Sequence, residues 1–261
     1  MFAEERRERI TKKLEKEKRV LAKALAEELD VSIDTIRRDL VMMEEKGLLK
    51  RTHGGAVPAS KVRTFPTPPS VRYGEGSSQQ NAVAREAVSF IEPGDTVFIS
   101  SASLHYVMLK YLPTEEPLTV ITNSTVVAEE LKARENIETY MVCGKLRSSG
   151  SVVDAFAMEF IKTLKIDICF LVGGGLTAAH GVSTTTTDAA GFHRVAAGVA
   201  RRRICLSTYD KLGHEAFAQI VPSQSLDVVI TDWDAPDEEV RHLTDSGVRV
   251  ITVEKEGQNE N

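Results

Sequence analysis

Hydrophobic and polar residues alternate with two different periods along this chain, and the change of period separates two regions. Up to residue 57 the apolar residues recur at spacings of three and four, which predicts amphipathic helices. Beyond residue 78 they gather in short continuous runs, which is typical of strands buried on both faces. The stretch between them is rich in proline, glycine and serine. We therefore expect a domain over residues 1–57, a linker over 58–78 and a second domain over 79–261.

The first region contains three predicted helices, over residues 4–18, over residues 20–29 and from residue 33 onward. Ile10 and Leu14 mark the buried face of the first helix. The predicted apolar stripe of the second helix consists of Leu21, Ala24, Leu25 and Leu29. Ser32 precedes the third helix, and its hydroxyl can accept hydrogen bonds from the free amides of the first turn. The predicted buried face of the third helix consists of Ile33, Ile36, Leu40 and Met43.

The opposite face of the third helix is a candidate DNA-reading surface. Thr35, Arg37 and Arg38 lie away from the apolar stripe near the N-terminus, where a recognition helix contacts base edges. An arginine can contact a guanine edge or neutralise a phosphate, and both interpretations stay open. Asp39 can pair with a basic neighbour and hold the helix in place. A charged run is more often a solvated helix face, but the three-helix setting favours contact with DNA.

A short basic hairpin is predicted after Gly47, which ends the third helix. Residues 48–52 indicate a strand and residues 53–55 a turn. Lys50, Arg51 and His53 would lie along the phosphate backbone as the wing of a winged helix-turn-helix.

Residues 35–40 (TIRRDL) followed by residues 47–56 (GLLKRTHGGA) resemble the N-terminal signature of the DeoR family of bacterial transcriptional regulators. Residues 5–10 (ERRERI) and 25–32 (LAEELDVS) are similar to the same pattern. The resemblance covers the whole first domain and implies binding to operator DNA. The candidate DNA-binding residues are Ser32, Thr35, Arg37, Arg38, Lys50, Arg51 and His53.

The second region predicts a Rossmann-like, mainly parallel α/β sheet covered by helices on both faces. Strand-like runs lie at residues 96–100, 118–122, 138–143, 167–172, 203–207, 227–231 and 248–253. Helical stretches between them lie at residues 81–91, 104–112, 126–134, 154–164 and 188–201.

The carboxyl ends of parallel strands are where such sheets bind ligands. Five of the predicted strands are followed by small, hydroxyl-bearing or cationic residues, which favour close backbone approach and anion binding. Each loop alone matches ordinary turn chemistry, but together they predict a pocket for a small anionic polyol. The candidate effector-binding residues are Ser101, Ala102, Ser103, Asn123, Ser124, Gly144, Lys145, Arg147, Gly173, Gly174, Thr184, Asp188 and Lys211.

The run from Thr184 to Asp188 allows two interpretations. It is either a polar lid whose aspartate receives a sugar hydroxyl, or the cap of the next helix, at Thr187 or Thr186. We favour Thr187 as the cap and leave Thr184, Thr185 and Asp188 as possible contacts. We expect that helix to reach Arg201, so that the arginines at 201–203 lie at its C-terminus, which favours cations. His180 and His193 are open between ligand contact and a structural role.

The second domain resembles the DeoR-type C-terminal sensor domain, which is similar in fold to ribose-5-phosphate isomerase and glucosamine-6-phosphate deaminase. The resemblance is carried by VITNS at 120–124, CGKLR at 143–147, HGVST at 180–184 and YDKLG at 209–213. It implies that the domain senses a phosphorylated sugar or related metabolite. The chain has Ala102, Ser103 and Leu104 where the family has Gly-Thr-Thr, and Thr208 and Asp154 where it has Asp and Gly. Sulfonated or carboxylated sugars, or a lost effector, therefore remain alternatives.

Composition adds little that contradicts this picture. The formal net charge is −5, and no apolar stretch approaches the roughly 20 residues of a transmembrane helix. The charged N-terminus lacks a signal-peptide core, so the expected compartment is the cytoplasm. Cys143, Cys169 and Cys205 lie in or beside apolar runs and are expected to be buried free thiols rather than metal ligands.

We therefore expect a DNA-binding regulator, a repressor of carbohydrate catabolism genes controlled by an anionic sugar, without catalytic residues, metal or cofactor. The rival hypothesis is a sugar-phosphate isomerase or deaminase with an appended DNA-binding domain. It needs paired acid and base groups, and Asp154, Asp188 and Asp210 form no clear pair. A third hypothesis is an architectural DNA binder without a ligand. Two-fold DNA sites require at least a dimer, so a homodimer or homotetramer is expected on double-stranded operator DNA, with no membrane contact.

Overall fold

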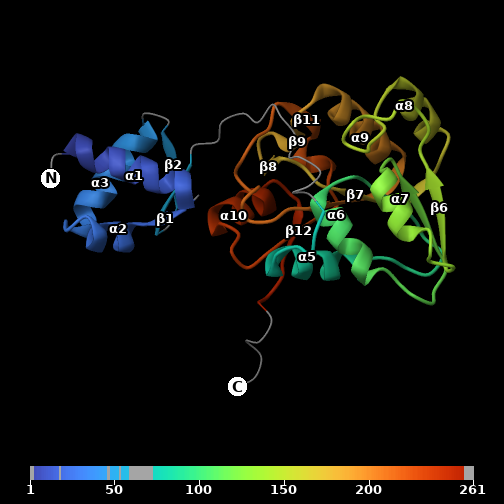
Figure 1. The fold of residues 1–261 in the computed structure, drawn as a ribbon, viewed down its shortest axis with the longest axis horizontal. Coiled ribbons are helices and arrows are strands. Elements are labelled where there is room, and N and C mark those ends of the chain that lie inside the picture. Colours follow the sequence, from blue (N-terminus) through green and yellow to red (C-terminus); the bar gives the residue numbers. More distant parts are fainter. Residues whose placement is uncertain (1–2, 18, 46–47, 53, 59–72, 256–261) are drawn as a thin grey trace, which may run out of the picture. The chain divides into compact units, whose positions relative to one another are not determined.

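The structure, a computed structural model, describes residues 3–17, 19–45, 48–52, 54–58 and 73–255. Contacts within the chain divide it into two compact units, residues 1–61 and residues 62–261 (Figure 1).

The N-terminal unit combines three helices with a small antiparallel sheet. Its elements are α1 (Ala3–Glu17), β1 (Val20–Leu21), α2 (Ala22–Glu28), α3 (Ile33–Glu45), β2 (Leu49–Thr52) and β3 (Gly55–Pro58). Strand β3 pairs with β2 and β1 on its two sides, so the sheet order is β1-β3-β2. This is the predicted winged helix-turn-helix. Gly47 and His53 lie outside the described residues, as does the side chain of Lys50.

The core of this unit corrects the predicted apolar stripes in two places. Leu21 is 49% exposed, because residues 20–21 form a strand on which neighbouring side chains alternate between the two faces. Ala24, on α2, is also exposed. Ala22 and Ala26 are buried instead. Ile33, at the first position of α3, is 37% exposed. The remaining predicted residues are buried in the core: Ile10, Leu14, Leu25, Leu29, Ile36, Leu40 and Met43.

The C-terminal unit is built on a parallel sheet, as the strand-like runs predict. The seven strands are β4 (Thr96–Ile99), β5 (Leu118–Thr122), β6 (Ile137–Met141), β7 (Ile166–Leu171), β10 (Ala200–Leu206), β12 (Val228–Thr231) and β13 (Arg249–Thr252). Their order is β13-β12-β10-β7-β4-β5-β6, and all neighbours are parallel. A second, antiparallel sheet has the order β11-β9-β8 and was not predicted. Its strands are β8 (Gly175–Thr177), β9 (Gly181–Thr184) and β11 (Ala218–Val221).

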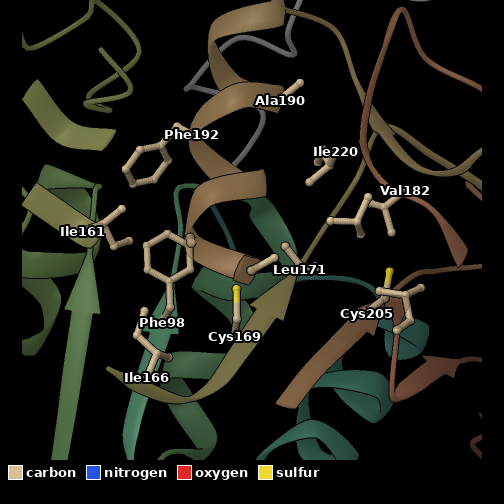
Figure 2. Packing of buried hydrophobic residues seen from close by; sticks show 14 of the residues in the cluster. Phe98, Ile161, Ile166, Cys169, Leu171, Val182, Ala190, Phe192, Cys205 and Ile220 are labelled. Atoms are coloured by element: carbon tan, nitrogen blue, oxygen red, sulfur yellow. The ribbon is translucent and has the colours of Figure 1, made fainter. Parts of the chain in front are cut away.

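Helices cover both faces of the parallel sheet. They are α5 (Ser78–Val88), α6 (Ser103–Met108) with the 3₁₀ turn η1 (Leu109–Tyr111), α7 (Thr125–Leu131), α8 (Ala155–Lys162), α9 (Thr187–Val199) and α10 (Asp237–Asp245), with a further 3₁₀ turn, η2 (Ser223–Ser225). Val97 and Ile99 on β4 belong to the core shared with α5, α6 and α7. Phe98, between them, points to the other face and packs against Phe192 of α9, with ring centroids 5.9 Å apart (Figure 2).

Helix α9 is shorter than predicted, and its ends correct two expectations. Thr186, the alternative to the favoured Thr187, is the N-cap, and its side chain accepts from the amide of Ala189. The helix ends at Val199, so the arginines at 201–203 lie on strand β10 rather than at a helix end. Arg201 and Arg203 pair with aspartates on neighbouring segments, and Arg202 stacks on an aromatic ring. These partners, and not the dipole of α9, stabilise the three positive charges.

Three further expectations are settled by the described residues. Cys169 and Cys205 are buried free thiols, whereas Cys143 is exposed. The predicted linker ends too late, because Ser77 caps α5 in a capping box with Gln80 and the helix begins at Ser78. No described helix has both the length and the apolar character needed to cross a membrane.

Candidate functional site

The third helix of the N-terminal unit is fixed by a buried ion pair. Asp39 on α3 accepts from Arg6 Nε at 2.5 Å and from Arg7 Nε at 2.9 Å, both on α1. Only 4% of the Asp39 side chain is exposed. The predicted pairing of Asp39 with a basic neighbour is therefore confirmed, and it locks α3 onto α1.

The opposite face of α3 presents its polar side chains to solvent. Arg37 and Arg38 are exposed, and Arg37 Nη1 lies 3.2 Å from Asp34 Oδ1 in a pair that is largely solvated. The Ser32 hydroxyl accepts from the amide of Thr35 at 3.1 Å, which confirms the predicted cap at the start of α3. An exposed ion pair is weak, so Arg37 can exchange its partner for DNA at little cost.

The wing is tied to α3 through its first strand. The amide of Arg51 on β2 donates to Glu44 Oε1 at 2.7 Å, and its guanidinium lies 3.8 Å from Glu44 Oε2. These contacts hold strand β2 in a fixed position relative to α3.

A cavity of about 500 Å³ lies in the C-terminal unit, among the loops that follow β4, β7 and β10. Its wall also includes the segment before α8 and the start of α9. Eight of the predicted effector-binding residues line it: Ser101, Ala102, Ser103, Arg147, Gly173, Gly174, Thr184 and Lys211. These loops therefore meet at the carboxyl ends of the parallel strands, where ligands of such sheets bind.

Five predicted residues do not line this cavity: Asn123, Ser124, Gly144, Lys145 and Asp188. The first two are fully buried and hold local structure. Asn123 Nδ2 donates to the carbonyl of Val152 at 3.0 Å, and Ser124 Oγ caps α7 by accepting from Val127.

The other three face local partners or solvent. Gly144 packs on Asp154, whose carboxylate accepts from the amide of Lys145 at 2.8 Å. Asp188 is exposed in the first turn of α9. Asp154 is therefore a helix cap rather than a cavity group.

Among the described residues, the charged groups of the cavity wall are two cations and one carboxylate. Lys211 Nζ lies 2.5 Å from Asp210 Oδ2, and Thr208 Oγ1 donates to the other oxygen of that carboxylate at 2.6 Å. Burial raises the pKa of Asp210, but the charge and hydrogen bonds of Lys211 and the Thr208 bond outweigh it and leave the pKa below its ordinary value. Arg147 is a second cation on the wall. The wall can therefore bind one anionic group while remaining close to neutral overall.

Sequence reasoning missed much of the polar lining. The serines at 148, 149, 151 and 207 lie on the wall and were not among the candidates. The wall also includes Thr185 and Thr186, from the run that was open between lid and cap, and His193, which was open between ligand contact and a structural role. The run of serines at 148–151 is visible in the sequence and could have indicated the loop. The position of His193 depends on how α9 crosses the sheet, which no local pattern predicts. In the described residues no cluster of His, Cys, Asp and Glu could hold a metal ion.

The segment directly before α5, predicted as linker, forms part of the cavity wall. Gly74, Gly76 and Gln80 line the cavity. Tyr73 donates its hydroxyl to the carbonyl of Ser101 at 3.3 Å, and its ring packs on Tyr106 with centroids 5.1 Å apart. This stretch is therefore packed against the first cavity loop and is not a free connector.

The sequence as a whole matches known families in both units. Residues 6–62 match the family described as the DeoR-like helix-turn-helix domain, and residues 75–233 match the DeoR C terminal sensor domain. The HTH-type transcriptional repressor GlcR of Bacillus subtilis is 30% identical over 98% of each chain. The HTH-type transcriptional regulator GolR of Listeria innocua is 29% identical over 89% of this chain and 91% of its own length.

Among solved structures, ribose 5-phosphate isomerase A from Methanocaldococcus jannaschii covers 51% of this chain and 52% of its own, with 15% identity and a TM-score of 0.36. That similarity is too low to argue from. The parallel sheet and the family matches, not this neighbour, confirm the predicted α/β architecture.

Proposed function

Because the chain belongs to the DeoR family of transcriptional regulators, we propose that it is a repressor of carbohydrate catabolism genes that a small anionic sugar releases from operator DNA. It is a DNA-binding regulator rather than an enzyme, as its relatives are. The observation that carries the DNA part is the anchored helix α3, whose buried face holds Asp39 and whose outer face holds Arg37 and Arg38.

Repression is supported by the relative from Bacillus subtilis, which is named a transcriptional repressor. A two-fold operator requires two reading helices, so the acting species is a homodimer or a homotetramer. The DNA contacts are proposed to include Ser32, Thr35 and Arg51 besides the two arginines of α3.

The effector part rests on the cavity in the C-terminal unit. A volume of about 500 Å³ lies within the range of small-molecule pockets. Arg147 and Lys211 supply positive charge, and serine and threonine hydroxyls supply hydrogen bonds. Ala102, at the N-cap of α6, makes no side-chain cap bond, and Leu104 is buried beside it. The anion is therefore proposed to rely on the two cations, and it can be a phosphate, sulfonate or carboxylate.

The DNA proposal is tested with a duplex that the wild-type protein selects from a random pool. Arg37→Ala and Arg38→Ala are expected to lower specific affinity by about one to two orders of magnitude each, because an arginine–base contact contributes about 1–3 kcal/mol. Arg241→Ala, an exposed arginine on α10, is the matched control. Wild-type affinity in both α3 variants would contradict the assignment.

The effector proposal is tested by thermal shift against hexose phosphates, hexonates and sulfonated hexoses. A ligand at 100 times its dissociation constant stabilises the protein by about 2.7 kcal/mol, which is easily measured. Lys211→Ala is expected to reduce the shift. If no compound stabilises the wild-type protein, the anionic-sugar proposal is wrong.

A further inference from the structure

Two polar atoms of the cavity wall are buried without a hydrogen-bond partner among the described residues. They are His193 Nε2, on α9, and Ser207 Oγ, directly after β10. Buried polar groups in folded proteins are nearly always paired, because leaving one unpaired carries its full desolvation penalty. Their position on the wall of a cavity therefore points to pairing with a bound molecule.

The contacts of His193 define which hydrogen bond it can make. Its Nδ1 lies 2.7 Å from the carbonyl of Ala189, and a carbonyl only accepts, so Nδ1 carries the proton. Burial lowers the pKa of His193, so the ring is neutral. Nε2 is then a bare acceptor. The ring is held edge-on by Phe98 and Phe192, with centroids 6.1 and 5.5 Å away.

The neighbouring imidazole adds no positive charge to this part of the wall. His105 is fully buried on α6, and its Nδ1 accepts from the amide of Ser100 at 3.0 Å. Burial and the adjacent His193 lower the pKa of His105 to about 3. Neither imidazole therefore adds positive charge to the cavity, whose cations among the described residues are Lys211 and Arg147.

We propose that His193 and Ser207 form a subsite for a neutral hydroxyl group of the effector. A bare imidazole nitrogen needs a hydrogen-bond donor, and a hydroxyl supplies one, whereas a fully ionised phosphate, sulfonate or carboxylate does not. One ligand would thus present its anionic group to the cations and a neutral hydroxyl to His193 and Ser207. This inference rests on the proposed effector function and adds a second recognition element to it.

The ligand-free protein gives the first test. In ¹⁵N NMR spectra of full-length protein labelled at histidine, His193 Nε2 is expected to show the shift of an unprotonated nitrogen at pH 7. A protonated Nε2 would overturn the proposal, because the atom would then be a donor.

The second test uses calorimetry with the same panel of hexose phosphates, hexonates and sulfonated hexoses, and with the monodeoxy analogues of any compound that binds. His193→Phe keeps a ring of similar size but removes the acceptor, and it is expected to weaken binding about tenfold. Ser207→Ala, a smaller change, is expected to weaken binding of the same compound. His242→Phe, on the exposed side of α10, is the control and keeps wild-type affinity.

The analogues separate a lost contact from a damaged fold. One monodeoxy analogue is expected to bind wild-type protein and His193→Phe alike, because the hydroxyl that the histidine receives is missing from it. If His193→Phe weakens binding of the parent compound and of every analogue equally, or weakens binding of none, the subsite proposal is wrong and the effector function stands. If the wild-type protein binds no member of the panel, both proposals fail.

Discussion

Replacing Asp39 with alanine is expected to destabilise the N-terminal unit selectively. The carboxylate bridges two arginines of α1 and is 4% exposed, while the side chains of Arg6 and Arg7 are 9% and 22% exposed. Removing one partner of a buried pair costs about 3–5 kcal/mol, because the remaining buried charge loses that partner. Arg7 is open enough to regain water, so we expect the lower end, about 3 kcal/mol. A unit of this size is stable by only roughly 3–9 kcal/mol.

Hydrogen exchange on the full-length protein measures this loss where it occurs. A loss of about 3 kcal/mol increases exchange of the amides in α1, α2 and α3 by about two orders of magnitude. Peptides from β4 and β7 serve as the internal reference and are expected to be unchanged. Asp34→Ala is the matched control, since it also removes an aspartate of α3 that pairs with an arginine, but one whose side chain is 72% exposed. That change is expected to cost less than about 1 kcal/mol.

Two results would refute the reasoning. If the amides of Asp39→Ala exchanged their hydrogens at the wild-type rate, the buried pair would contribute nothing to holding α3 on α1. If Asp34→Ala had the same effect as Asp39→Ala, burial would not be what distinguishes the two ion pairs.

Two further predictions concern the C-terminal unit, whose unfolding can be followed through the single tryptophan, Trp233. Gly181 and Gly94 both have positive φ, but an added Cβ at Gly181 would lie 2.2 Å from a backbone oxygen, whereas nothing lies within 4 Å of Gly94. Gly94→Ala is expected to cost about 1–2 kcal/mol and Gly181→Ala clearly more; equal losses in urea titrations would contradict the clash. Burial lowers the pKa of His105 to about 3, so below pH 6.5 the unfolded chain binds a proton that the folded protein rejects. The unfolding free energy should therefore fall as the pH decreases from 7 to 5, by at most about 1.4 kcal/mol per pH unit for this group, and His105→Asn should flatten the profile.

The parallel sheet could be predicted because its strands carry their own signal. Runs such as 167–172 and 227–231 are apolar without interruption, as burial on both faces requires. The antiparallel sheet carries no such signal. Strand β9 is the short, partly polar segment Gly181–Thr184, and its partner β11 lies far along the chain. Helix α10 was also missed, since most of its residues are polar and its single buried residue is Leu243.

The cavity was predictable mainly where its residues lie in the loop that follows a strand of the parallel sheet. Ser101, Gly173 and Lys211 obey that rule, because the topology of a parallel sheet brings strand ends together whatever their side chains do. This rule does not predict which way an individual side chain points. Asn123 obeys it equally but turns inward to bind the backbone at Val152. His193 is an exception to this rule, because it reaches the cavity from the second turn of α9 and not from a loop after a strand.

The packing of Tyr73 and the two glycines that follow it decides where this regulator can be divided. A hybrid protein that joined a foreign DNA-binding domain to residue 79, where the sequence pattern ends the linker, would replace Gly74 and Gly76 of the cavity wall. It would also lose the bond from Tyr73 to Ser101. A junction placed before Tyr73 transfers the whole wall with the sensor. The segment thus belongs to the sensor domain, and we expect an exchange of domains to keep the cavity intact only when this segment moves with it.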